Sequence, residues 1–458
     1  MDTTTLTPTN PATGEELASY EMATKKEVEQ VLTTATETFD SWNSRPLRER
    51  EELLVAAAET LRENKQRYAA LMTREMGKPL AHSEGEIEKC AWVCEHYAEH
   101  ARRYLNSTAH PSPPGTAVET VYEPLGPVLA VMPWNFPFWQ VFRFAAPALA
   151  AGNVCLLKHA SNVPGSARAV ADVFEEAGFP EGAFQTLLLS ADRVDNVVAD
   201  DRVVAATLTG SGPAGRAVAG TAGAELKPSV LELGGSDPFI VLEDAAIEAA
   251  VETGAWARLL NNGQSCIAAK RFILHEEIAD EFSDQFVAEV ESYTVGDPME
   301  RETDIGPQSA PEAVETLDRQ VKATIDAGAT VLTGGEPLDR DGAFYPPTVL
   351  TDIPADSPAA SEELFGPVAS LFTVESEQEA IELANDTQFG LGASIWTENR
   401  DRGKEVARQI DAGCVYINQL VKSDPRVPFG GIKESGYGRE LAGEGIREFV
   451  NKKTVWVE

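Results

Sequence analysis

The chain has no long apolar run, few cysteines and no N-terminal targeting pattern. No stretch of about 18 or more apolar residues occurs, so a membrane-spanning helix is not expected. The N-terminus, MDTTT, lacks the basic region and apolar core of a secretory signal. The cysteines are odd in number and scattered, which favours a reducing cytoplasm over a disulfide framework. No His or Cys cluster completes a metal site, so no metal is expected. The cysteines are Cys90, Cys94, Cys155, Cys266 and Cys414.

Positive charge is also scarce. Lys and Arg total 38 against 73 Asp and Glu, which gives a net charge of -35. Such a surface repels nucleic acid and anionic membranes, so neither is expected as a partner. It also repels itself at low salt, whereas in molar salt the Debye length falls to about 3 Å. With only 14 lysines, this acidity is typical of proteins from salt-accumulating halophiles. A merely acidic mesophilic enzyme is the alternative.

The length of 458 residues exceeds one typical domain and is enough for two large cores. Amphipathic helical patterns fill residues 25–105, and a proline-rich break follows at 109–115. After an expected strand at 116–122, apolar strands alternate with helices up to Glu232, and a second such run continues to about residue 420. This alternation predicts an α/β fold with doubly wound parallel sheets. In the first run, strands are expected at 128–132, 154–157, 184–188 and 203–208, with helices from about residues 139, 164, 193 and 213.

Cys266 lies in a polar stretch, NNGQSCIAAKR at residues 261–271, between an expected helix and an expected strand. Two Asn, a Gly and a Gln favour a loop, on which a thiol can be reached by solvent and substrate. Neighbouring backbone N–H groups can lower the thiol pKa and hold an oxyanion. The residues therefore indicate a candidate nucleophile, with a structural core cysteine as the alternative.

Glu232 lies in an apolar strand that runs into a Gly-Gly turn, VLELGGSDP at residues 230–238. A carboxylate desolvated there has a raised pKa, which suits a general base. A strand-end Glu that faces solvent is the alternative.

The segments ELGG at 232–235 and GQSC at 263–266 resemble the paired signature of the aldehyde dehydrogenase superfamily. Four more segments match this family in the same order, so the resemblance extends from near residue 120 to near residue 440. They are PWNFP at 133–137, LTGS at 208–211, ELFGP at 363–367 and PFGG at 428–431.

The resemblance implies two doubly wound domains, a Rossmann-like cofactor domain and a catalytic domain, with a small oligomerisation β-flap. The cofactor domain is expected at 1–105 and 125–232, and the catalytic domain at 233–435. Residues 106–124 and 436–458 are the expected oligomerisation and bridging segments, in a homodimer or homotetramer.

The resemblance also implies the oxidation of an aldehyde to an acid through a thiohemiacetal and a thioester. Cys266 is the expected nucleophile, and the Asn135 side chain with the Cys266 N–H is the expected oxyanion site. Glu232 is expected to activate water for release of the acid.

A dinucleotide is the implied cofactor. The turn at 210–215 matches G-x-G-x-x-G and suits a pyrophosphate at a helix N-terminus. The resemblance assigns Glu232 to catalysis and the adenosine ribose to Lys158 instead. Ser161 stands where NAD-preferring members often carry Glu, so use of NADP, alone or together with NAD, is favoured over strict use of NAD. The expected cofactor-binding residues are Trp134, Lys158, Ser161, Gly210, Ser211, Gly215, Glu363 and Phe365.

Arg143, eight residues after Asn135, is the expected clamp for a distal carboxylate on the substrate. Succinic semialdehyde dehydrogenases carry Arg at this spacing, so succinate semialdehyde is the favoured substrate. The better-known branch has a second Arg where this chain has Leu260, and Ser423 or Arg426 is expected to replace it. A packing or ion-pair role is the alternative for Arg143.

Other activities stay open on the sequence. They are oxidation of another semialdehyde, such as 2-oxoglutarate semialdehyde, oxidation of general aldehydes, and transfer of the acyl group to coenzyme A. A non-catalytic binding protein of the same fold is disfavoured because Cys266, Glu232 and Asn135 are all present.

Overall fold

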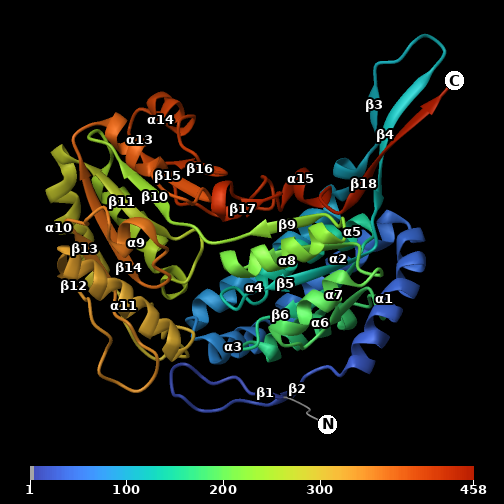
Figure 1. The fold of residues 1–458 in the computed structure, drawn as a ribbon, viewed down its shortest axis with the longest axis horizontal. Coiled ribbons are helices and arrows are strands. Elements are labelled where there is room, and N and C mark those ends of the chain that lie inside the picture. Colours follow the sequence, from blue (N-terminus) through green and yellow to red (C-terminus); the bar gives the residue numbers. More distant parts are fainter. Residues whose placement is uncertain (1–4) are drawn as a thin grey trace.

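The computed structural model describes residues 5–458, which form two α/β units and a projecting three-stranded sheet (Figure 1). Two short strands, β1 (Thr5–Leu6) and β2 (Tyr20–Glu21), pair antiparallel near the N-terminus. Among residues 5–458, no helix combines the length and the apolar character that a membrane crossing requires.

Four helices precede the first sheet, as the amphipathic patterns predict. Helix α1 begins with a capping box in which Thr24 and Glu27 bind each other's backbone N–H groups. Cys90 and Cys94 lie on the buried face of α4, four residues apart and therefore about one turn apart. The helices are α1 (Lys25–Ser44), α2 (Leu47–Glu63), α3 (Lys65–Met76) and α4 (Leu80–Leu105).

The first sheet has six strands in the order β17-β9-β8-β5-β6-β7, parallel except for β17. The strand order reverses between β5 and β8, and ligands of such folds bind outside the carboxyl ends of the strands at this switch point. The strands are β5 (Pro127–Met132), β6 (Val154–His159), β7 (Phe184–Thr186), β8 (Ala205–Thr209), β9 (Ser229–Glu232) and β17 (Gly436–Tyr437). The intervening helices are α5 (Trp139–Ala151), α6 (Pro164–Glu176), η1 (Ala191–Arg193), α7 (Val194–Ala199) and α8 (Gly212–Ala224).

The second sheet has seven strands in the order β12-β13-β14-β11-β10-β15-β16, and only β12 runs antiparallel to its neighbour. The expectation of two doubly wound α/β units is thereby confirmed. Its strands are β10 (Asp237–Val241), β11 (Ala269–His275), β12 (Thr330–Thr333), β13 (Thr348–Thr351), β14 (Val368–Val374), β15 (Gly392–Trp396) and β16 (Cys414–Ile417). Its helices are α9 (Ile247–Leu259), η2 (Leu260–Gly263), α10 (Glu276–Ser292), α11 (Pro311–Ala327), α12 (Pro358–Ser361), α13 (Glu377–Asn385) and α14 (Arg400–Ala407).

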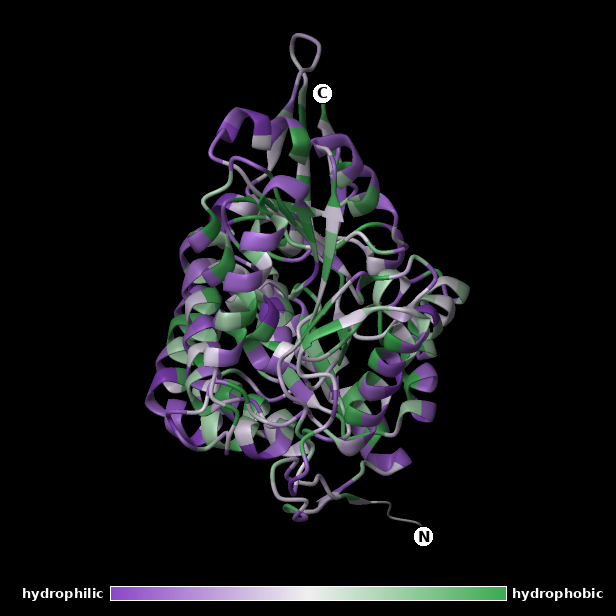
Figure 2. Cartoon of the chain, turned by 90° about the vertical axis from the view of Figure 1, so that its left-hand side faces the viewer, coloured by the Kyte–Doolittle hydropathy of each residue, from purple (hydrophilic) through white to green (hydrophobic). Residues whose placement is uncertain are grey.

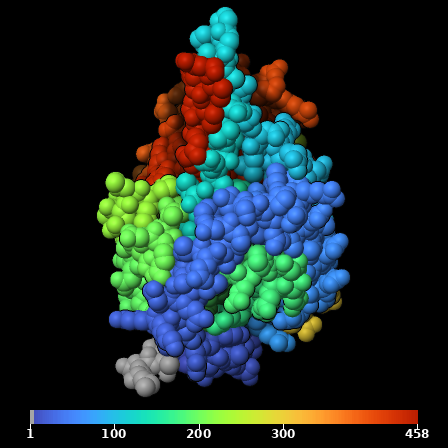
Figure 3. All heavy atoms as spheres, turned by 90° about the vertical axis from the view of Figure 1, so that its right-hand side faces the viewer, coloured from blue at the N-terminus to red at the C-terminus, as the bar shows by residue number. Residues whose placement is uncertain are grey.

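The third sheet projects from the body. The C-terminal strand β18 (Val450–Val457) pairs along its whole length with β4 (Ala117–Pro124), and β3 (Thr108–His110) pairs with the other edge of β4. Figure 3 shows these segments, in red and cyan, rising together above the molecule. The chain reaches β18 through η3 (Lys433–Ser435), β17 and α15 (Ala442–Ile446).

Apolar side chains lie between the layers, and charged ones lie outside. Figure 2 shows hydrophobic residues on the strands and on the inner turns of the helices, with hydrophilic residues on the outer turns. One buried cluster joins α1–α6 to the first sheet, and it contains Trp42, Tyr97 and Phe142. A second cluster packs α9 and α10 against the second sheet through Phe239, Phe272 and other residues.

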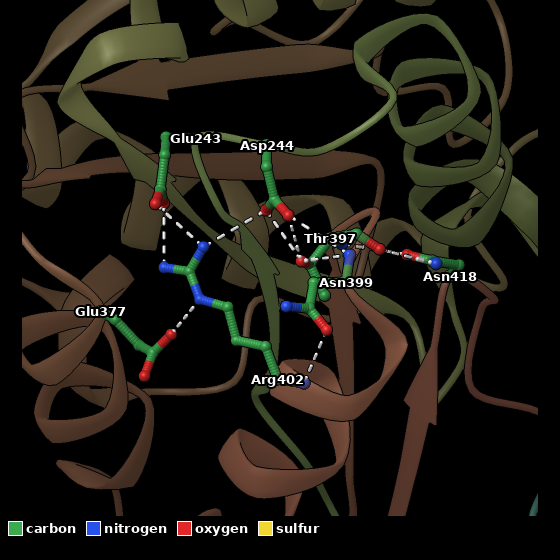
Figure 4. A network of polar contacts seen from close by, with 7 residues as sticks. All are labelled: Glu243, Asp244, Glu377, Thr397, Asn399, Arg402 and Asn418. Carbon is green, nitrogen blue, oxygen red and sulfur yellow. Dashed lines mark hydrogen bonds and ion pairs between the residues drawn. The ribbon is translucent and has the colours of Figure 1, made fainter.

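An ionic network joins three segments at one end of the second sheet (Figure 4). Arg402 of α14 donates two hydrogen bonds to Glu243, at 2.9 and 3.0 Å, and a third to Glu377 at the start of α13. Asp244 accepts from the Thr397 hydroxyl at 2.7 and 2.8 Å. One guanidinium thus neutralises carboxylates from two segments, with Asp244 also 3.4 Å from it.

Replacement of Arg402 by Met is expected to lower the free energy of unfolding by about 1–3 kcal/mol, because three neighbouring carboxylates lose their cation. The loss should be smaller in molar KCl, which screens the remaining repulsion. Denaturant unfolding at low and high salt measures both effects. Arg400→Met is the control, because Arg400 is exposed and makes no ion pair among residues 5–458. Equal destabilisation by the two variants would contradict the prediction.

Candidate active site

A cavity of ≈ 310 Å³ opens at the switch point of the first sheet, between the two α/β units. Loops that follow β5, β8 and β9 contribute to it, together with Cys266 and the segment that precedes β14. The cavity therefore brings together most of the residues predicted around the cofactor and the thiol. Its lining residues are Pro133, Trp134, Asn135, Thr209, Gly210, Ser211, Leu233, Gly234, Cys266, Glu363 and Phe365.

The loop that carries Cys266 begins with two left-handed residues in succession. Asn261 has φ 57° and ψ 39°, and Asn262 has φ 59° and ψ 28°, a conformation that Asn tolerates better than most residues. The Asn262 amide donates to the carbonyls of Gly77 (2.9 Å) and Pro307 (2.8 Å), and its carbonyl oxygen accepts from the Gly306 N–H. The loop is thus held by segments far away in the sequence.

Asn135 is bound directly to this loop. Its side-chain amide donates to the Gln264 carbonyl at 3.1 Å, and the Asn261 amide donates to the Asn135 carbonyl at 2.7 Å. Because a side-chain amide has two N–H donors, one donor of Asn135 has no partner among residues 5–458, and Asn135 and Cys266 line the same cavity. His159 supports the loop that carries Asn135, since its Nε2–H donates to the Pro137 carbonyl at 2.8 Å. Burial lowers the pKa of His159 to about 4, so it is neutral here.

Cys266 is partly exposed, whereas the other four cysteines are buried. Its desolvated position raises the thiol pKa to about 12, and the positive charges of Arg143 and Lys270 oppose this rise. Lys270 donates to the carbonyl oxygens of Ser265 (2.9 Å) and Cys266 (2.7 Å) and pairs with Glu363 at 3.2 Å. Ligands that bring positive charge or N–H donors to the sulfur would therefore favour the thiolate.

Glu232 ends β9 and is buried, as the apolar strand predicts. Burial raises its pKa well above the usual range, Arg143 lowers it, and Glu440 raises it again. Neither carboxylate oxygen has a hydrogen-bond partner among residues 5–458. A buried carboxyl group with free oxygens and a raised pKa can accept a proton from water.

Arg143 lies on α5 with its guanidinium paired to the buried Glu440. Its Nη2 is 3.3 Å from the Thr209 hydroxyl, and the guanidinium stands 4.9 Å from the Phe429 ring. The prediction that Arg143 binds a substrate carboxylate stays a prediction, and it requires this ion pair to open. No local sequence pattern marks Glu440 as a site residue, although it lies close to the PFGG segment and forms a backbone bridge with Phe429.

Two predicted cofactor positions lie at the end of β6. Lys158 is buried, and its amine has no ion pair among residues 5–458, so burial lowers its pKa. Ser161 is exposed and lines a neighbouring cavity with residues of the N-terminal segment. On α8, Gly215 packs so closely on Leu233 that an added Cβ would lie 2.7 Å from that side chain. Gly215 thus allows α8 to approach the end of β9.

The remaining predicted substrate residues, Ser423 and Arg426, differ in surroundings. Arg426 is largely exposed and bound to Asp424 by two hydrogen bonds. Ser423 is buried, and its hydroxyl accepts from Trp139 Nε1 (3.0 Å) and Lys89 Nζ (2.9 Å). The sequence does not predict the position of Lys89, because a lysine within an amphipathic helix is typical of a solvent-facing residue.

The fold and the site define a nucleotide-dependent oxidoreductase that acts on aldehydes. The model of the aldehyde dehydrogenase family matches residues 1–455, and the chain belongs to this family.

Relatives and solved structures agree with this assignment over nearly the whole chain. A probable succinate-semialdehyde dehydrogenase [NADP(+)] of Synechocystis sp. is 52% identical over 98% of both chains. The succinate-semialdehyde dehydrogenase [NADP(+)] of Mycobacterium leprae is 51% identical, also over 98% of both. The structure of succinic semialdehyde dehydrogenase from Streptococcus pyogenes, in complex with NADP+, has a TM-score of 0.97 at 38% identity and covers 99% of both chains.

The raised pKa of Cys266 predicts slow alkylation of the cofactor-free protein at neutral pH. Below the pKa the thiolate fraction rises about tenfold per pH unit, so the iodoacetamide rate should rise as steeply from pH 6 to 9. Mass spectrometry of the Cys266 peptide measures this rate, and Cys266→Ala gives the background from the buried thiols. A rate that levels off below pH 9 would show that the thiol is already ionised.

Proposed function

We propose that this protein oxidises succinate semialdehyde to succinate with NADP as the oxidant. The observation that carries the proposal is the cavity that Cys266 and Asn135 line together, with Glu232 buried at the end of the strand that leads into it, in a chain 52% identical, over 98% of its length, to a relative of that name. The geometry supports the oxidation of an aldehyde, and the relatives support the choice of aldehyde and cofactor.

Cys266 attacks the aldehyde carbon as a thiolate and forms a thiohemiacetal. The free N–H of the Asn135 amide and the backbone N–H of Cys266 hold the oxyanion. Bound NADP would supply the acceptor for the hydride that leaves the substrate carbon. A thioester on Cys266 then remains.

Glu232 takes a proton from the water that attacks the thioester. Its oxygens have no hydrogen-bond partner among residues 5–458, and its raised pKa makes the ionised carboxylate a stronger base than an ordinary one. Arg143 and Glu440 act on this step through charge, because the cation stabilises ionised Glu232 and the second carboxylate opposes it. Release of the acid restores Cys266.

The residues around the cavity fit NADP. The first turn of α8 follows Ser211, whose side chain makes no cap hydrogen bond, so the helix N–H groups are available to a pyrophosphate. The buried Lys158 amine has no carboxylate partner among residues 5–458, and the small Ser161 leaves room for a 2′-phosphate. Glu363 would hold the nicotinamide ribose. Phe365 and Trp134, whose ring centroids lie 5.8 Å apart, would flank the nicotinamide.

The proposal includes the predicted division of labour between domains. The cofactor binds to residues 1–105 and 125–232, and residues 233–435 carry the thiol. The projecting sheet of β3, β4 and β18 joins the protomers of a dimer or tetramer. Trp456 and Val457 on this sheet are each 56% exposed, which supports burial against a second copy.

The net charge of -35 supports function at high salt, and the odd, scattered cysteines support a location in the cytoplasm.

The proposed activity predicts that kcat/KM for succinate semialdehyde exceeds kcat/KM for butanal by at least about 100-fold, since a site that pairs the carboxylate rejects an uncharged analogue. NADP should be preferred to NAD, and activity should rise with KCl toward molar concentration. Absorbance at 340 nm measures all three, and coenzyme A should not be needed. Preference for butanal or a longer keto-acid semialdehyde would contradict the choice of substrate.

Glu232→Gln is expected to give a burst of about one NADPH per site, followed by turnover at least about 100-fold slower, because the thioester forms but lacks its base. Rapid mixing followed at 340 nm resolves the two phases. The exposed Glu398→Gln should behave as the wild type. Normal steady turnover of Glu232→Gln would assign deacylation to another group.

A further inference from the structure

Three side chains from separate elements meet at the Ser423 hydroxyl. Lys89 comes from α4, Trp139 from the first turn of α5, and Ser423 from the segment after β16. Lys89 Nζ and Trp139 Nε1 donate to Ser423 Oγ at 2.9 and 3.0 Å. The ammonium also stands 4.2 Å from the Trp139 ring centroid. We call these residues the Lys89 cluster.

The Lys89 cluster offers donors and few acceptors. Ser423 Oγ receives two hydrogen bonds, which occupy both of its lone pairs and leave its own O–H free to donate. Lys89 has three N–H donors and uses one of them here, and the Trp139 indole is a donor only. A group that satisfies such a cluster must be an acceptor, and a carboxylate is the acceptor that also matches the charge.

Lys89 has no direct carboxylate partner among residues 5–458, although Glu86 and Asp424 act on its charge from farther away. Lys89 makes no ion pair with a carboxylate anywhere in residues 5–458, although the chain has 73 acidic residues. Burial and the charge of Arg143 lower its pKa to about 8. Three other cations near this site are paired, Arg143 with Glu440, Arg426 with Asp424 and Lys78 with Glu86. Lys89 is therefore the cation that an incoming anion can pair with.

The scaffold connects the Lys89 cluster to the loop that carries Asn135. Trp139 lies four residues after Asn135, at the start of the helix that follows the Asn135 loop. Glu86, one turn before Lys89 on α4, accepts from the N–H groups of Phe138 (2.8 Å) and Trp139 (2.9 Å). Helix α4 thus holds the start of α5 and supplies Lys89. The charge of Arg143 acts on both Lys89 and Cys266.

We propose that Lys89 Nζ, together with the Ser423 hydroxyl, binds the distal carboxylate of the semialdehyde and sets the preference for carboxylated substrates. The inference rests on the proposed function and assigns its specificity to Lys89, with Arg143 retained as the partner of Glu440. Neutral aldehydes of similar length do not use this contact.

The test is the ratio of kcat/KM for succinate semialdehyde to kcat/KM for butanal. Lys89→Met is expected to lower this ratio at least about 30-fold while butanal oxidation changes less than about threefold. Ser423→Ala should lower it about tenfold, and Lys89→Arg should retain most of it, because a cation remains. Lys322→Met, an exposed lysine paired with Asp318, is the control and should leave the ratio unchanged. An unchanged ratio in Lys89→Met, or an equal loss for both substrates, would overturn the inference.

Binding of succinate separates this inference from the proposed function. Calorimetric titration with succinate should show at least about tenfold weaker binding to Lys89→Met than to the wild type and to Lys322→Met. Titration of Arg143→Leu, with its fold checked by circular dichroism, distinguishes the contribution of Arg143 to succinate binding from that of Lys89. A wild type that oxidises butanal as well as succinate semialdehyde refutes the proposed substrate. Succinate binding that is lost in Lys89→Met would still support Lys89 as the carboxylate site, and equal binding by both proteins would refute it.

Discussion

The hydrogen bonds of Asn262 hold the candidate site together. Asn262 occupies a left-handed conformation four residues before Cys266, and its side chain spans Gly77, Gly306 and Pro307. Gly77 ends α3 in the N-terminal unit, whereas Asn262 belongs to the second unit. The thiol therefore reaches its position only when both units are folded and docked, which explains why a polar loop in the protein interior keeps one conformation.

Two buried cations around the site each bind specific partners. Lys270 binds the carbonyls of the Cys266 loop and Glu363, and Arg143 binds Glu440 beside Glu232. An unpaired buried charge is costly, so these pairs constrain which cation can serve a ligand. The surface follows a different rule, because most of its excess acid is exposed and only salt screens it. In the network around Arg402, this cation at the surface of the second unit pairs with Glu243 and Glu377 from two separate segments.

The sequence predicts the elements and the members of the site better than their contacts. The strands expected at 128–132 and 154–157 and the helices from residues 139 and 164 are confirmed within a few residues, because local patterns determine them. The raised pKa of Glu232 follows from its apolar strand. By contrast, Glu440 lies 297 residues from Arg143, and no local pattern shows that the two side chains pair.

Lys89 is a second residue whose contacts the sequence does not predict. In the sequence it stands between Glu88 and Cys90 on a helix rich in charge, where a lysine normally faces water. Only the packing of α4 against α5 turns it toward Trp139 and Ser423. The spacing of Arg143 from Asn135 indicates a cation near the substrate, but spacing cannot show which cation is already neutralised. Glu440 pairs with Arg143, so a carboxylate can reach this cation only if the ion pair opens, and only the folded structure shows that condition.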